Sequence, residues 1–144
     1  TMKNWLKFFT GFLFISTLIV FTACNKDDDD TPEPTPDDPI VLILSATIPE
    51  GLTDPTISYN DENGDEQTET LTSIRWEKTM SVATGYEVYL KVTATIPTGL
   101  SGTAEVSAKG TRTNPSLSWS QLNPQTFTNP SQDIPLSLKI EHTF

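Results

Sequence analysis

Cysteine and histidine are almost absent from this chain of 144 residues, which contains one of each. A lone cysteine cannot form an intrachain disulfide, and the two residues together cannot supply the shell of a zinc site. A Ser-His-Asp device needs a histidine held by an acid and a serine, but His142 lies near the end of the sequence, where chains are often poorly ordered. We therefore expect a protein that is not an enzyme and that carries no metal and no cofactor.

Positive charge is also scarce. The chain has 9 Lys and Arg against 19 Asp and Glu, and its formal net charge is −10. Residues 40–144 alone contain 6 basic and 12 acidic side chains. An acidic surface repels phosphate, so nucleic acid and anionic lipid headgroups are poor partners.

The sequence has a single long apolar run, from Phe8 to Ala23, which is uncharged over 16 residues. A helix needs about 20 apolar residues to span a bilayer, so this run is short for a transmembrane anchor. It follows Lys3 and Lys7, and a charged start, an apolar stretch and small residues before a cut site are typical of a secretory signal. An uncleaved anchor or a buried helix are the alternatives.

The stretch Phe21-Thr22-Ala23-Cys24 resembles the bacterial lipobox, although Phe21 departs from the usual leucine. The resemblance implies that residues 1–23 are removed as a signal peptide and that Cys24 carries lipid. Each buried CH₂ contributes about 0.8 kcal/mol, so two or three acyl chains on Cys24 would hold the protein firmly in a membrane.

The residues after this cysteine resemble the surface-export signal of lipoproteins in the Bacteroidetes group: Lys26 is followed by Asp27, Asp28, Asp29 and Asp30. The resemblance implies an outer-membrane protein displayed on the cell surface. The alternative is a solvated acidic spacer, because runs of like charge are usually extended. Alternating prolines in "TPEPTPDDP" stiffen the chain, so residues 24–39 are predicted to form a tether.

Residues 40–144 are predicted to form one all-β domain, because their apolar residues alternate with a period of two. In Tyr86–Thr95 the residues Val88, Leu90 and Val92 share one face, and the same pattern recurs in Thr103–Lys109 and around Leu136 and Leu138. No stretch has the pattern of an amphipathic helix. The number and length of such segments favour a single antiparallel β-sandwich of about seven strands.

A hairpin is expected around "DENGD", where Asn63-Gly64 supplies the positive φ values that a tight turn requires. The nearby acids also invite a calcium interpretation, but glycine and glutamate do not fall at the sixth and twelfth positions of an EF-hand loop. A second short feature is an internal echo, "ATIPEGL" at Ala46–Leu52 and "ATIPTGL" at Ala94–Leu100. It is either a duplicated binding loop or one turn solution used twice.

The segment from Ile57 to Val82 is similar to the start of the soluble domain of MmpS-like proteins. Tyr59, Asn63, Gly64 and Trp76 match that pattern in order. The resemblance implies an immunoglobulin-like sandwich and a role as an accessory partner of lipid-exporting transporters. This chain lacks the cysteine pair that those proteins often carry, and it has a lipobox in place of their transmembrane helix.

Three aromatic residues are the candidate ligand contacts: Tyr89, Trp76 and Trp119. Tyr89 shares a strand face with Glu87 and Lys91, which should be in water. An exposed aromatic among polar residues can stack on a sugar or anchor a protein, although an isolated exposed tyrosine is also ordinary. Most of the other aromatic residues should lie in the core, as tryptophan usually does in sandwiches.

Taken together, the sequence predicts a non-catalytic, lipid-anchored envelope protein that serves as a binding or adhesion module for a glycan, peptide or protein. The alternative is an accessory subunit of an envelope transporter, for lipid export or for nutrients.

Overall fold

The structure is a computed structural model and describes residues 37–144. The predicted signal peptide, the lipidation of Cys24 and the export signal of Lys26, Asp27, Asp28, Asp29 and Asp30 lie outside these residues. The described residues contain eight strands: β1 (Ile40–Thr47), β2 (Thr53–Asn60), β3 (Glu66–Thr70), β4 (Arg75–Val82), β5 (Glu87–Ile96), β6 (Gly102–Arg112), β7 (Leu117–Phe127) and β8 (Ile134–Thr143).

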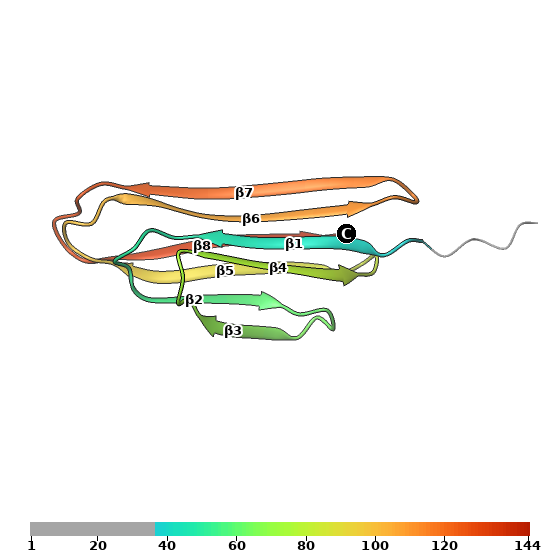
Figure 1. Ribbon diagram of the computed structural model, residues 1–144, viewed down its shortest axis with the longest axis horizontal. Helices are drawn as coiled ribbons and strands as arrows, with labels where there is room; N and C mark the ends of the chain where they lie inside the picture. The colour runs from blue at the N-terminus through green and yellow to red at the C-terminus, as the bar shows by residue number, and fades with distance from the viewer. Residues whose placement is uncertain (1–36) are drawn as a thin grey trace, which may run out of the picture. The chain divides into compact units, whose positions relative to one another are not determined.

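The strands form two four-stranded sheets, with the orders β4-β1-β6-β7 and β3-β2-β5-β8. Every pair of neighbouring strands is antiparallel, and Figure 1 shows the strands of both sheets running along the same axis. The predicted all-β sandwich is therefore confirmed, with eight strands where about seven were expected. Between residues 37 and 144 there is no helix long and apolar enough to cross a membrane.

The core lies between the sheets and follows directly from the alternation in the sequence. In β5 the side chains of Val88, Leu90 and Val92 are buried, while Glu87 between them and the turn is exposed. The same holds for β1, where Leu42 is fully buried and Val41 is 43% exposed. Burying such an aliphatic side chain contributes about 1.5–3 kcal/mol, so the two inner faces supply most of the drive for folding.

The two halves of the chain repeat one arrangement. In the first half β1 pairs with β4 and β2 with β3; in the second, β5 pairs with β8 and β6 with β7. The pairs β1–β6 and β2–β5 join the halves, so each half contributes two strands to each sheet. This order differs from the immunoglobulin constant arrangement, in which the first two strands are neighbours in one sheet.

The echoed segments fall at equivalent places in this repeat, after β1 and after β5. They also lie against each other, since a Cβ on Gly51 would be 3.3 Å from Leu100 Cδ1. Gly102, two residues after the second segment, is equally close to the first: a Cβ there would be 2.9 Å from Pro49 Cβ. Both glycines of the echo, Gly51 and Gly99, have positive φ (92° and 84°). The contacts favour the interpretation that the same strand-and-turn geometry occurs twice and closes this end of the sandwich.

Candidate functional site

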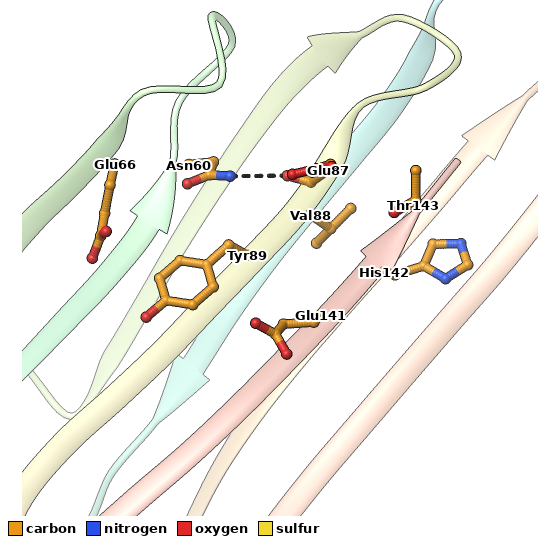
Figure 2. Close-up of a pocket in the computed structure, with 8 residues that line it drawn as sticks. All are labelled: Asn60, Glu66, Glu87, Val88, Tyr89, Glu141, His142 and Thr143. Atoms are coloured by element: carbon orange, nitrogen blue, oxygen red, sulfur yellow. Dashed lines mark hydrogen bonds between the residues drawn. The ribbon is translucent and has the colours of Figure 1, made fainter.

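A shallow hollow of about 340 Å³ opens on the outer face of the β3-β2-β5-β8 sheet, and Figure 2 shows the residues that line it. They come from the ends of four strands: Asn60, Glu66, Glu87, Val88, Tyr89, Glu141, His142 and Thr143. Tyr89 is one of the three aromatic residues predicted to contact a ligand. The hollow is the surface of the described domain where an aromatic ring and several carboxylates meet.

The pairing of β5 with β8 places these side chains together. Glu87 lies opposite Thr143, and Tyr89 lies opposite Glu141. Side chains that share a face of an antiparallel pair at opposed positions approach within about 5 Å at their Cβ atoms, so Tyr89 and Glu141 are immediate neighbours. Asn60, at the end of β2, donates a hydrogen bond from Nδ2 to the Glu87 carbonyl oxygen (3.1 Å) and ties that side of the hollow to β5.

The Tyr89 ring is half-buried, and one ammonium group already lies over it. Lys139 Nζ is 5.5 Å from the ring centroid, within the range of a cation–π contact. The same Nζ lies 2.5 Å from Glu141 Oε1, and this hydrogen bond raises the pKa of Lys139 above its usual value. The exposed pair of Lys139 and Glu141 therefore places one cation over the ring.

The chemistry of the lining groups restricts what can enter. Glu66, Glu87 and Glu141 are carboxylates, which accept hydrogen bonds and cannot donate them when ionised. A ligand that bonds to these three carboxylates presents donors, as sugar hydroxyls, ammonium groups and guanidinium groups do. Phosphorylated and other anionic ligands meet repulsion from the three carboxylates.

The β2–β3 loop beside the hollow is organised by Asp61. Its Oδ1 accepts hydrogen bonds from the backbone N–H of Asn63 (2.9 Å) and Asp65 (3.1 Å). The bond from Asn63 is the main cause that holds the pKa of Asp61 below its usual value. Gly64 has a φ of 86°, whereas Asn63 is not among the residues of positive φ, so the connection is a five-residue loop and not a two-residue Asn-Gly turn.

The Asp61 loop also bears on the calcium interpretation. Both oxygens of the carboxylate are engaged within the loop, because Gln67 Nε2 donates to Oδ2 (3.0 Å). Between Asp37 and Phe144 no three His, Cys, Asp or Glu side chains come together in a way that would hold a metal ion.

Neither tryptophan lines the hollow, although Trp119 packs against His142, which does. Trp76 on β4 is partly buried, with its ring centroid 5.1 Å from that of Tyr59. Trp119 on β7 stacks on His142, with centroids 4.0 Å apart and an angle of 9° between the rings. Phe144 meets both rings edge-on. The structure therefore does not bring Tyr89, Trp76 and Trp119 together, and the two tryptophans fill the margins of the core.

Other polar contacts were not indicated by the sequence. The Tyr59 hydroxyl donates to Glu69 Oε1 (2.5 Å) and accepts from Lys78 Nζ (2.8 Å), which raises the pKa of Lys78 above its usual value. Arg112 donates from Nη1 to Asp37 Oδ2 (3.0 Å), so the end of the predicted tether is fastened to the sandwich. These contacts join residues 10 to 75 positions apart, and no local pattern in the sequence signals them.

Comparison with known proteins gives no relative: no family model, no curated protein and no solved structure matches this chain. The fold and the hollow therefore define the class, which is an eight-stranded all-β sandwich with a carboxylate-lined hollow on one sheet face.

Proposed function

We propose that this protein is a non-catalytic binding module of the bacterial cell envelope, anchored by lipid on Cys24 and displayed on the outer surface. The observation that supports it is the hollow around Tyr89, where an aromatic face lies among Asn60 and three carboxylates on the side of a sheet. Aromatic rings bordered by hydrogen-bonding groups suit sugars and cationic side chains. The ligand is a neutral or cationic molecule rich in donors: a glycan or a basic peptide.

The binding experiment is a screen of immobilised neutral glycans and basic peptides against the full chain in detergent. We expect Tyr89→Ala to weaken binding of the recovered ligand by about tenfold or more, because stacking or a cation–π contact contributes about 0.5–2 kcal/mol and the neighbouring groups lose their alignment. Glu87→Gln should weaken the binding of a cationic ligand more than the binding of a neutral glycan, so this variant distinguishes the two ligand classes.

The matched control is Thr95→Ala, on the same outer face of β5 but outside the hollow. It should leave affinity unchanged. Binding that survives Tyr89→Ala, or that falls equally in Thr95→Ala, would move the site away from the hollow. Recovery of one transporter in amounts comparable to the bait, with no dependence on Tyr89, would instead make the protein an accessory subunit.

A further inference from the structure

The strand β4 is an open edge of the sandwich. The sheets have four edge strands, and three of them are short or interrupted: β3 has five residues, β7 contains Pro124 and β8 contains Pro135. A side chain of β7 also lies against β8, because Asn123 Nδ2 donates to the Lys139 carbonyl oxygen (3.1 Å). β4 has eight residues and no proline. Unpaired edges of this kind are templates for pairing with another strand.

The backbone groups that face this edge belong to alternate residues. The N–H of Ile48 donates to the Ile74 carbonyl oxygen (2.9 Å), so Ile74 directs its groups toward β1. In an antiparallel ladder the direction alternates, so Arg75 and Glu77 direct theirs away from β1. The Ser73 hydroxyl donates to the Arg75 carbonyl oxygen (2.5 Å), which agrees with that direction. A carbonyl oxygen has two lone pairs, so this one can still accept a bond from a partner strand.

We propose that β4 pairs antiparallel with β4 of a second copy of this chain, about a two-fold axis that passes through Trp76. In this register Arg75 lies opposite Glu77 of the second copy, and the arrangement occurs twice by symmetry. The two residues then exchange backbone hydrogen bonds, and their side chains meet on the outer face. Within residues 37–144 the ion pairs are Arg112–Asp37 and Lys139–Glu141, so the charges of Arg75 and Glu77 are not engaged in the single chain.

The residue on the axis supports the same register. Trp76 would face its own copy at a non-hydrogen-bonded position, where opposed side chains are closest and aromatic pairs stabilise a sheet. Its indole is only partly buried in the single chain. An axis through Lys78 would place two ammonium groups opposite each other, and an axis through Met80 would leave Arg75 and Glu77 without charged partners. Charge complementarity therefore selects Trp76.

The pairing has a consequence for anchored molecules. Ile40 pairs with Val82, so the start of β1 and the end of β4 lie at one end of the sandwich, and Trp76 lies toward the other end. Two copies joined at Trp76 therefore point the starts of their described chains in opposite directions. If the anchor on Cys24 holds, which belongs to the proposed function, the pair bridges two facing membranes and adhesion is homophilic.

The test uses charge reversal in the full chain in detergent, with the protein mass measured by sedimentation. Arg75→Glu and Glu77→Arg should each weaken self-association by about tenfold or more, because each creates two like-charge pairs. An equimolar mixture of the two variants should associate about as strongly as the wild type, because every glutamate then faces an arginine.

The matched controls are Lys109→Glu and Glu62→Arg, which make the same changes of net charge away from β4 and should not alter association. A wild-type chain that stays monomeric at on the order of 0.1 mM would overturn the proposal. Normal self-association of either Arg75→Glu or Glu77→Arg alone would also overturn it, as would an equimolar mixture of the two variants that does not associate.

Lipid vesicles carrying the anchored chain test the bridging. Vesicles that carry the wild-type chain should cluster. Vesicles that carry only Arg75→Glu, or only Glu77→Arg, should not cluster, but a mixture of the two kinds should. Association in detergent without clustering would overturn the bridging geometry. These variants should keep ligand binding at Tyr89, so failure of the pairing and failure of the proposed function are separate results.

Discussion

At the scale of single residues, hydroxyl groups of tyrosines join parts of the fold that apolar packing alone would leave loose. The single proton of the Tyr86 hydroxyl is shared between the carbonyl oxygens of Asn60 and Asp61, both 2.8 Å from the hydroxyl oxygen, and so fixes the start of the β2–β3 loop beside the hollow. Burial, followed by the charges of Asp61 and Glu62, raises the pKa of Tyr86 to about 12 from 10.0. The folded chain therefore keeps this proton at pH values where the unfolded chain has lost it.

This shift predicts how stability depends on alkaline pH. The contribution of Tyr86 is complete below pH 10.0, the unfolded value, and is lost as the pH rises toward about 12. Tyr86→Phe should lower the free energy of unfolding by about 1 kcal/mol at pH 7, because two carbonyl groups lose their donor. It should also make the fall in stability between pH 9 and pH 11 shallower than in the wild type, as measured by urea unfolding. A variant whose fall is as steep as that of the wild type would contradict the assignment.

At the scale of strands, the sequence predicts which segments are strands and which side chains of each strand are buried. It does not predict which strands are neighbours or in which register they pair. The alternation in Val88, Leu90 and Val92 gives the inner face of β5 without any knowledge of its neighbours. The hollow requires the register of β5 against β8, which brings Glu141 beside Tyr89. That register pairs residues 38 to 56 positions apart, so the sequence indicated Tyr89 as exposed but not the residues around it.

The stacking of Trp119 on His142 is another contact set by the assembly of strands. Gly110 on β6 lies opposite Trp119 on β7 and leaves the space that the Phe144 ring fills. A Cβ at Gly110 would overlap that ring. In the sequence, Gly110 is only a glycine at an inward-facing position of an alternating strand, and nothing indicates that the Phe144 ring fills the space beside it. The sequence argued against a catalytic role for His142, but it held no sign that this ring would lie against Trp119 and Phe144.

The contact between Gly110 and Phe144 gives a prediction for β6 and β8. Gly110→Ala should lower the free energy of unfolding by about 1–3 kcal/mol, because the methyl group displaces the Phe144 ring and disturbs its neighbours. In a Phe144→Ala background the same change should cost much less, and the double-mutant cycle should give a coupling of about 1 kcal/mol or more. Equal costs in both backgrounds would show that Phe144 does not occupy this space.

At the scale of the whole molecule, the hollow around Tyr89 and the edge at β4 are separate surfaces. The hollow lies on the outer face of the β3-β2-β5-β8 sheet, near the end where β1 begins. The open edge at β4 belongs to the other sheet, and the proposed axis through Trp76 lies toward the opposite end. A pair of copies formed at β4 would therefore present two hollows, and a ligand with repeated units would bind both with increased avidity.

The central claim, that a ligand binds in the hollow around Tyr89, is tested most directly by photo-crosslinking in cells that make the full chain. A photoreactive amino acid at Thr143, which lines the hollow, is compared with one at Ser118, on the outer face of the other sheet. We predict one recurrent adduct, glycan or basic peptide, at Thr143 and none at Ser118, and its loss when Tyr89 is changed to alanine. An adduct at both positions, or one at Thr143 that persists without Tyr89, would contradict the account.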